Sequence, residues 1–264
     1  MSKQLIFTSG LPRSCSTLLQ NLLAQHPEVH ATGTSLLHEF GYLARPIFET
    51  AEAKTMDRAV LEQMYFDYVR AGCENAYNSV TDRPIVADKC RSWIGHLDQL
   101  FKIWPDAKVL VPVRDIRGVL TSMEKKWRQH PTPFNGAEKQ NPANWTTIEK
   151  RVNGWLSGPP IGIAIERLHD AMRFKDRLHF VHAEELAENP AQAMADVWKY
   201  LGMNAPAHNF ENVDQYTHEL DAGWPYGDHT IRPEVKPLPV EWNDYLGRNL
   251  AEQIRQKFEW VNDL

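Results

Sequence analysis

The sequence predicts an α/β fold with three layers, in which a central parallel β-sheet is flanked by helices. Four apolar runs have the length of buried strands: residues 4–9, 85–87, 107–113 and 178–182. A segment with helical periodicity follows each of these runs. Strands that alternate with helices pair in parallel, because each helix crosses over the sheet. No repeat, low-complexity tract or linker interrupts the 264 residues, so we expect one domain spanning residues 1–264.

The remaining elements complete this alternation. A short strand is predicted at residues 28–31, and helices are predicted through residues 18–23, 56–80, 97–104, 119–127, 147–173, 190–201 and 245–261. Gly158-Pro159-Pro160 interrupts the helix over 147–173, and Gly202 is expected to end the helix before it. The helix over 56–80 is expected to place one apolar face against the core: Leu61, Met64, Tyr65, Tyr68, Val69 and Cys73.

Composition and charge exclude several classes of protein. With 42% apolar and 24% charged residues the chain has a globular composition, and its net charge of −5 disfavours nucleic acid and anionic membrane as partners. No apolar run approaches the roughly 20 residues of a membrane span, and no signal peptide precedes the first strand. The three scattered cysteines fit a reducing compartment, and no metal-ligand spacing occurs. We therefore expect a soluble, cytoplasmic and metal-free protein.

The segment after the first strand predicts an anion-binding site. The strand breaks at Gly10, and a helix that opens with Ser16 and Thr17 follows. The N–H groups in the first turn of a helix have no partner in the chain and carry the positive end of the helix dipole, so a phosphate or sulfate can satisfy them. Arg13 adds a guanidinium suited to such an anion. We name residues 10–17 the anion loop; the alternative is a β–α turn without a ligand.

The anion loop departs from the nucleotide-hydrolysis motif G-x-x-x-x-G-K-[ST]. Cys15 stands where the second Gly belongs and Ser16 where the Lys belongs, while the positive charge lies on Arg13. Pro12-Arg13-Ser14-Cys15-Ser16-Thr17 resembles instead the 5′-phosphosulfate loop of the sulfotransferases, from which it differs only by Cys15 in place of Gly. A thiol at a helix N-terminus can have a lowered pKa, which would apply to Cys15; we do not expect a catalytic thiol.

A second anion-binding pair is predicted at the third long strand. Arg114 follows this strand at the carboxyl edge, where open α/β sheets bind ligands, and Ser122 lies about two helical turns further on. Both side chains can therefore reach one phosphate. The alternative is that Arg114 pairs with Asp115 or Asp88. Residues 114–122 resemble the sulfotransferase 3′-phosphate motif R-[ND]-P-x-D-x-x-x-S, with Ile116 for Pro and Gly118 for Asp.

Two further segments match in the same order. Residues 181–190 resemble the family segment Y-E-D-L-x-x-[DN]-P, and Tyr200-Leu201-Gly202 resembles the family ending of the next helix. The resemblance to the sulfotransferases thus extends over residues 4–202. It implies a P-loop-like fold and in-line transfer of a sulfuryl group from 3′-phosphoadenosine 5′-phosphosulfate (PAPS) to a hydroxyl or amine, without a metal.

The resemblance also implies roles for particular residues. The donor contacts would be Leu11, Pro12, Arg13, Ser14, Cys15, Ser16 and Thr17 at the 5′ side, Arg114 and Ser122 at the 3′-phosphate, and His229 and Arg232 in a closing segment. Arg13 and Lys89 would be catalytic, Lys89 by stabilising charge on the bridging oxygen with Arg91 assisting; the alternative is a surface pair of Lys89 with Asp88. Since residues 33–35, which correspond to the Glu-bearing turn of the tyrosylprotein sulfotransferases, contain no base, the candidate bases are Glu39 and His38.

Other functions stay open at this point. The runner-up is a P-loop kinase or nucleotide hydrolase that uses ATP–Mg, with residues 85–88 as its magnesium-binding strand. A non-catalytic nucleotide-binding protein is the third class. For the sulfotransferase, we expect a small hydroxyl-bearing molecule as acceptor, with a peptide tyrosine or a glycan as alternatives. Its pocket would be built from residues 33–80, 128–170 and 204–240.

Overall fold

Five parallel strands form one sheet in the computed structural model, which describes residues 2–129, 142–219 and 229–264. In spatial order the strands are β2 (Val29–Ala31), β3 (Ile85–Lys89), β1 (Gln4–Thr8), β4 (Lys108–Val113) and β5 (Leu178–His182). The parallel sheet and its predicted strands are confirmed. Thr8 pairs with Lys89 on one side and with Leu110 on the other, so the carboxyl ends of β1, β3 and β4 meet at one edge.

The helices connect these strands. The α-helices are α1 (Ser16–Leu23), α2 (Leu37–Leu43), α3 (Ala51–Thr55), α4 (Arg58–Asn75), α5 (Leu97–Ile103), α6 (Ile116–Gln129), α8 (Ile148–Leu156), α9 (Ile161–Ala171), α10 (Ala183–Glu188), α11 (Pro190–Leu201), α12 (Trp242–Leu246) and α13 (Arg248–Asn262). Short 3₁₀ helices are η1 (Arg45–Glu49), η2 (Trp93–His96), η3 (Pro142–Trp145) and η4 (Met172–Arg177). Within the described ranges, no helix combines the length and apolarity that a bilayer crossing requires.

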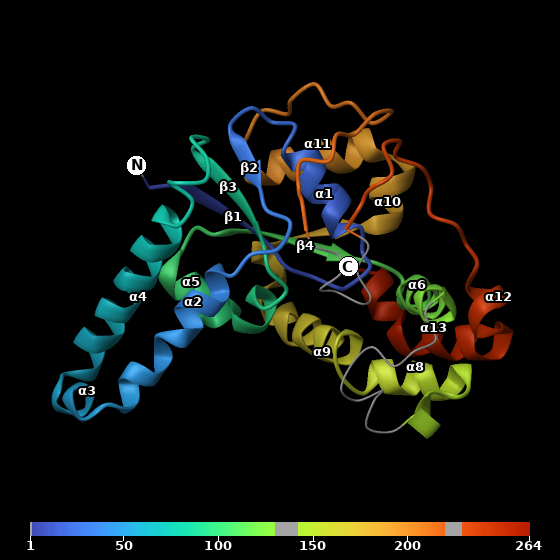
Figure 1. Cartoon of the computed structure of the whole chain (residues 1–264), viewed down its shortest axis with the longest axis horizontal. Helices are drawn as coiled ribbons and strands as arrows, with labels where there is room; N and C mark the ends of the chain where they lie inside the picture. Colours follow the sequence, from blue (N-terminus) through green and yellow to red (C-terminus); the bar gives the residue numbers. More distant parts are fainter. Residues whose placement is uncertain (1, 130–141, 220–228) are drawn as a thin grey trace.

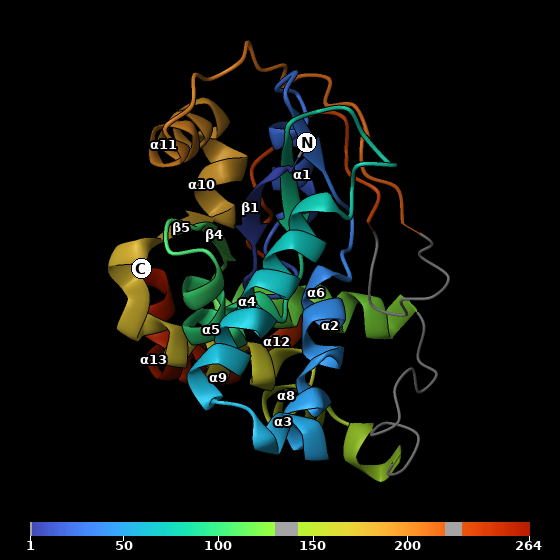
Figure 2. The same ribbon diagram turned by 90° about the vertical axis from the view of Figure 1, so that its left-hand side faces the viewer.

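Alternate residues of each strand enter two separate cores, which produces the three layers. Leu5 and Phe7 of β1 pack into the core shared with α4, α5, α6 and α9, whereas Ile6 packs into the core shared with α1 and α11. Figure 1 shows α1, α10 and α11 above the sheet and α4, α5 and α9 below it, and Figure 2 shows the same layers from the side. The helices therefore cover both faces of the sheet and leave its carboxyl edge for the loops.

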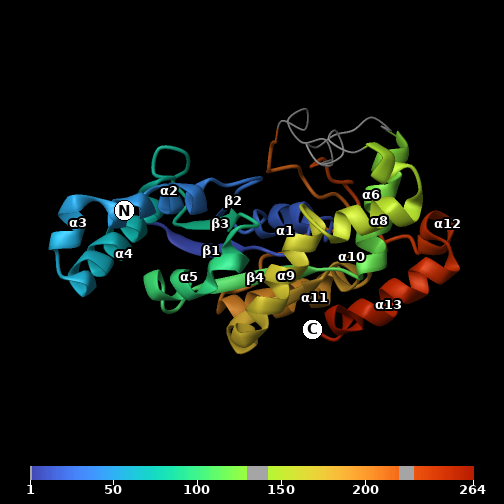
Figure 3. The same ribbon diagram turned by 90° about the horizontal axis from the view of Figure 1, so that it is seen from below.

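The two ends of the molecule are formed by helices whose bounds were predicted less accurately from the sequence. Figure 3 shows α3 and α4 at one end and α6, α8, α12 and α13 at the other. The terminal helix expected over 245–261 is two helices, because Gly247 adopts φ 78° between α12 and α13. By contrast, α11 ends at Gly202 (φ 71°) as predicted.

The buried face of α4 is narrower than predicted. This helix begins after Asp57, whose carboxylate caps it, and it buries Leu61, Tyr65, Val69 and Cys73. Met64 and Tyr68 are instead 55% and 70% exposed, which corrects the prediction that they join the core. The buried i, i+4 row contacts α2 and α5, since Tyr65 Oη donates to Gly41 O and accepts from Gln99 Nε2.

Candidate functional site

The anion loop joins β1 to α1 at the carboxyl edge of the sheet. Arg13 and Cys15 have φ of 59° and 58°, the left-handed region that residues other than glycine rarely adopt. Leu11 N donates to Pro112 O over 2.9 Å, and Ser14 Oγ donates to Leu11 O over 2.6 Å. These bonds hold the loop in its tight turn against β4. No side chain of the described residues caps α1 at Cys15, so the first-turn N–H groups are left for an anion.

Arg13 connects the anion loop to the second predicted site. Its Nε donates to Ser122 Oγ of α6 over 2.9 Å, and its carbonyl oxygen accepts from Arg114 Nη1 over 3.0 Å. The structure therefore brings Arg13, Arg114 and Ser122 together, although the sequence pointed to them through two separate motifs. The pairing of Arg114 with Asp115, considered above, does not occur, because the carboxylate of Asp115 binds Arg117.

The buried Nε–H donor of Arg114 has no hydrogen-bond acceptor among the described residues. Its Nε lies 3.8 Å from Glu184 Oε1, beyond hydrogen-bonding distance, and no other described residue accepts from it. A buried donor without an acceptor is costly, which makes this atom a candidate ligand contact. The guanidinium lies against Gly118, where a Cβ would come within 2.7 Å of Arg114 Nε. The glycine that departs from the family motif thus makes room for Arg114.

Lys89 extends from the end of β3 to the first turn of α1. Its Nζ lies 3.3 Å from Thr17 Oγ1, so it brings a positive charge to the anion loop. The preceding residue, Asp88, is fully buried, and its Oδ2 accepts from Trp93 Nε1 over 2.7 Å. Burial raises the pKa of Asp88 to about 6. Asp88 is therefore neither a surface partner of Lys89 nor in the environment of a magnesium-binding carboxylate.

The sequence reasoning missed Glu219, which lies beside Lys89. Glu219 Oε1 is 3.4 Å from Lys89 Nζ and accepts from Thr34 Oγ1, while Oε2 is 2.7 Å from His229 Nδ1. Burial alone would raise the pKa of Glu219, but the hydrogen bonds from His229 and Thr34 and the charge of Lys89 lower it to about 2. A Cβ at Gly33 would come within 2.7 Å of Glu219 Cγ, so Gly33 gives this side chain its space.

Polar side chains of α1 and of the C-terminal segment hold Glu219 and His229 in place. Asn21 of α1 donates to Thr217 Oγ1 over 3.0 Å and accepts from Thr217 N over 3.0 Å. Gln215 donates to the carbonyl of His229 over 3.1 Å and accepts from Ile231 N over 2.9 Å. Two segments of the C-terminal region are thereby bound to α1. No local pattern marks this arrangement, because every bond in it joins residues of loops or of distant elements.

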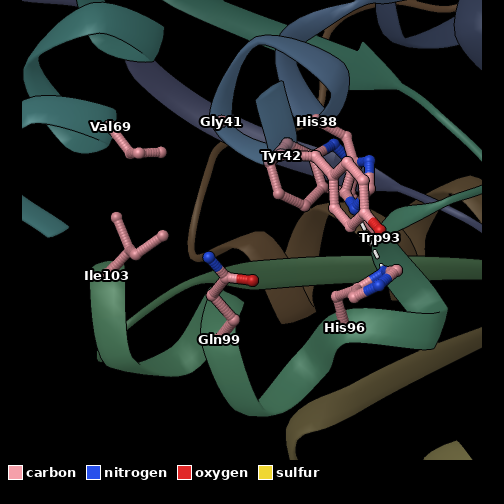
Figure 4. Close-up of a pocket in the computed structure, with 8 residues that line it drawn as sticks. All are labelled: His38, Gly41, Tyr42, Val69, Trp93, His96, Gln99 and Ile103. Atoms are coloured by element: carbon pink, nitrogen blue, oxygen red, sulfur yellow. Dashed lines mark hydrogen bonds between the residues drawn. The ribbon is translucent and has the colours of Figure 1, made fainter. Parts of the chain in front are cut away.

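The two predicted bases lie in a different cluster, between α2 and η2. His38 Nε2 is 3.0 Å from His96 Nδ1, and His38 Nδ1 is 3.3 Å from Glu39 Oε1. Figure 4 shows His38 and Tyr42 of α2 beside a small pocket, with a dashed line for the hydrogen bond between His38 and His96. Burial and the neighbouring His96 lower the pKa of His38. The hydrogen bonds of His38 and Glu39 therefore run to each other and to His96.

The other candidate residues lie around the anion loop. Burial raises the pKa of the Cys15 thiol despite the charges of Arg114 and Arg13, so the expectation of a lowered value is wrong. Arg232 is exposed, and its charge acts on Cys15, which places it near the start of α1. Arg91 is exposed and its charge acts on Glu219. Trp224 and Tyr226, two aromatic residues of the segment 204–240 expected to form part of the acceptor pocket, lie outside the described residues.

The comparisons with known proteins concern the family and the fold. A family model described as "Sulfotransferase family" matches residues 5–207. The nodulation protein NoeE of Sinorhizobium fredii is 23% identical over 228 residues, which cover 79% of this chain and 52% of NoeE. A putative protein-tyrosine sulfotransferase of Caenorhabditis briggsae is 27% identical over 127 residues, which cover 46% of this chain and 43% of that protein. The chain spans about half the length of the curated relatives it matches.

A solved structure shares the fold. The crystal structure of a sulfotransferase from Alicyclobacillus acidocaldarius aligns with a TM-score of 0.51 at 14% identity, over 99% of this chain and 97% of the other. At this identity the likeness concerns the fold, which is the P-loop-like arrangement expected from the sequence.

Proposed function

The chain belongs to the sulfotransferase family, and from this premise we propose that it transfers a sulfuryl group from PAPS to a hydroxyl or amine of an acceptor. The observation that carries the proposal is that one residue, Arg13, joins the two predicted anion sites. Its backbone lies in the turn before α1, and its side chain reaches Ser122 beside Arg114. PAPS carries an anionic group at each end of its ribose, and such a donor fits a site with two cationic ends.

The residues present fit this donor. At one end, the buried Nε of Arg114 lacks an acceptor, and Gly118 leaves the space that the guanidinium occupies. We propose that this nitrogen and Ser122 bind the 3′-phosphate, a group that ATP does not have. At the other end, the uncapped N-terminus of α1 and Lys89 would bind the 5′-phosphosulfate.

The proposed chemistry needs positioning and charge stabilisation. When bound, PAPS supplies the sulfuryl group and a phosphate as leaving group. Lys89 would stabilise the negative charge that develops on the bridging oxygen, since its Nζ lies beside the first turn of α1. The backbone N–H groups of the anion loop would orient the 5′ end for in-line attack. His229 and Arg232 were predicted to close over the donor, and for Arg232 this stays our proposal.

The proposal also covers the acceptor and the cellular compartment. We propose a small hydroxyl-bearing molecule as acceptor, bound by the segments expected from the sequence, residues 33–80, 128–170 and 204–240, of which 130–141 and 220–228 lie outside the described residues. The three cysteines are free, which supports the predicted reducing, cytoplasmic compartment. The alternative kinase or nucleotide hydrolase is disfavoured by Asp88, whose carboxyl is buried against Trp93.

An acceptor screen tests the proposed function. The full chain is incubated with PAPS and panels of phenols, alcohols, sugars and tyrosine peptides, and products are scored by the mass of one added sulfuryl group. We expect a product with at least one panel, formed orders of magnitude more slowly by Lys89→Ala. Binding of PAPS without turnover on any panel would support a non-catalytic protein instead, and phosphoryl transfer from ATP–Mg would contradict the proposal.

A further inference from the structure

We propose that His229 is the catalytic base that removes the acceptor's proton and that Glu219 is the positioning residue that holds it. This inference rests on the proposed sulfuryl transfer, because it assigns the proton that the acceptor hydroxyl must lose. It replaces Glu39 and His38, whose hydrogen bonds lie in the separate cluster around His96.

Geometry links His229 to the proposed site of reaction. His229 Nδ1 is 2.7 Å from Glu219 Oε2, and the other oxygen of the same carboxylate is 3.4 Å from Lys89 Nζ. Lys89 Nζ in turn is 3.3 Å from Thr17 Oγ1. One carboxylate therefore separates the imidazole from the lysine that would neutralise the leaving group. An acceptor bound beside this pair can give its proton to the imidazole.

The carboxylate of Glu219 is buried and is held in place by several neighbouring residues. Its side chain is 6% exposed, and that of Lys89 is 11% exposed. Thr34 donates to Oε1, and Gly33 allows the backbone of its turn to approach the Glu219 side chain. Asn21 fixes the backbone two residues before Glu219. A preorganised carboxylate of this kind can fix the orientation and tautomer of an imidazole.

The division of roles follows from proton affinity. The pKa of Glu219 is lowered to about 2, so its carboxylate is a poor acceptor for a hydroxyl proton near neutral pH. Because Nδ1 of His229 lies beside Glu219, the proposal assigns the acceptor's proton to Nε2. Among the residues that the structure describes, Lys89 lies beside the carboxylate of Glu219, and the guanidinium of Arg91 also acts on this carboxylate.

The step balances without a further reactant. The acceptor hydroxyl gives its proton to His229 Nε2 as its oxygen forms the new bond to sulfur. The bond between sulfur and the bridging oxygen breaks, and its electron pair leaves with the 5′-phosphate beside Lys89. The imidazolium, stabilised by the carboxylate of Glu219, returns the proton to solvent afterwards.

The test compares two phenols as acceptors for His229→Gln, Glu219→Gln and the control His179→Gln. His179 lies in β5 and stacks on Tyr200, outside the segments proposed to bind the acceptor. 4-Methylphenol must lose its proton during transfer, whereas p-nitrophenol is largely ionised in mildly alkaline buffer. With PAPS as donor we expect His229→Gln to lose about 10²–10⁴-fold in rate with 4-methylphenol and less than about tenfold with p-nitrophenol. Glu219→Gln should follow the same pattern with a smaller loss, and His179→Gln should match the wild type.

Equal losses with both phenols, or a wild-type rate of His229→Gln with 4-methylphenol, would overturn the assignment. A loss of rate in Glu219→Gln alone would also overturn the assignment, because the carboxylate of Glu219 would then be the base. Imidazole NMR of the full chain gives a readout that does not depend on an acceptor: Glu219→Gln should lower the titration midpoint of His229 by about 1–3 pH units. An unchanged midpoint contradicts the pairing. Calorimetry with 3′-phosphoadenosine 5′-phosphate (PAP) separates the two proposals, because a wild type that does not bind PAP contradicts the proposed function while the NMR result still decides the pair.

Discussion

Arg13 Nε donates a hydrogen bond to Ser122 Oγ across 109 residues of chain. This bond joins the turn before α1 to the middle of α6, and Arg114 completes it by donating to the carbonyl of Arg13. The two anion sites predicted from separate motifs are therefore one connected site. A change at either end is expected to affect the other, because Arg13 belongs to both.

Replacing Arg114 should lower the affinity for the sulfuryl donor more than it lowers the stability of the folded chain. Arg114→Ala removes a buried charged contact to the proposed 3′-phosphate, so we expect PAP to bind about 2–4 kcal/mol more weakly. Isothermal calorimetry measures the change, and thermal unfolding shows whether the variant is folded. Arg117→Ala is the matched control, because Arg117 binds Asp115 and stacks on Trp242 instead. Near-normal PAP affinity of Arg114→Ala would remove the 3′-phosphate assignment.

Gly118→Ala should weaken PAP binding without contacting the ligand. The added Cβ would come within 2.7 Å of Arg114 Nε, and the flexible guanidinium would be displaced while the helix stays intact. The control is Gly72→Ala in α4, where a Cβ meets no atom within 4 Å. It should leave PAP affinity unchanged and stabilise the chain by about 0.5–1 kcal/mol, since alanine favours the helix. Equal PAP affinities of the two variants would contradict the steric role of Gly118.

Asp88 should make the chain less stable as the pH rises from about 4 to about 6. Its pKa is raised from 3.8 to about 6 in the folded state, so within this window the folded chain keeps a proton that the unfolded chain has lost. The shift of roughly two pKa units corresponds to about 3 kcal/mol. The folded chain loses this full amount of stability above about pH 6. Asp88→Asn cannot ionise and keeps an oxygen for Trp93 Nε1.

Urea unfolding at several pH values measures this effect. The stability of Asp88→Asn relative to the wild type should rise through the window and then stay constant. Glu219 acts in the opposite sense, because its lowered pKa of about 2 adds stability that is lost as the pH falls below about 4.5. Comparing the two chains at each pH cancels that contribution. A difference that does not depend on pH would contradict the raised pKa of Asp88.

The strands and the anion loop could be predicted because their signals are local. An apolar run followed by Gly10 and hydroxyl residues describes one stretch of chain, and parallel pairing then places its end beside Lys89. Arg13, Arg114 and Ser122 were proposed for the same reason, each from a motif within a few residues. Their mutual hydrogen bonds could not be read from the sequence, since no motif states which side chain of one site reaches the other.

Glu219 shows where such reasoning stops. The stretch around it has neither helical nor strand periodicity, and Glu219 is placed by bonds that Thr217 makes to Asn21 of α1. His38 illustrates the converse: it follows the turn at residues 33–35 as a base was expected to do, but α2 turns its ring towards His96. The turn itself contributes Thr34 and Gly33, which hold the carboxylate from the C-terminal segment.

A titration with three nucleotides tests the central claim most directly. PAP, ATP–Mg and adenosine 5′-phosphosulfate are titrated by calorimetry into the full wild-type chain and into Arg114→Ala. Only PAP of the three carries the 3′-phosphate that Arg114 and Ser122 are proposed to bind. We expect the wild type to bind PAP most tightly, and Arg114→Ala to lose most of that preference. ATP–Mg binding more tightly than PAP, and equally well without Arg114, would contradict the sulfotransferase account.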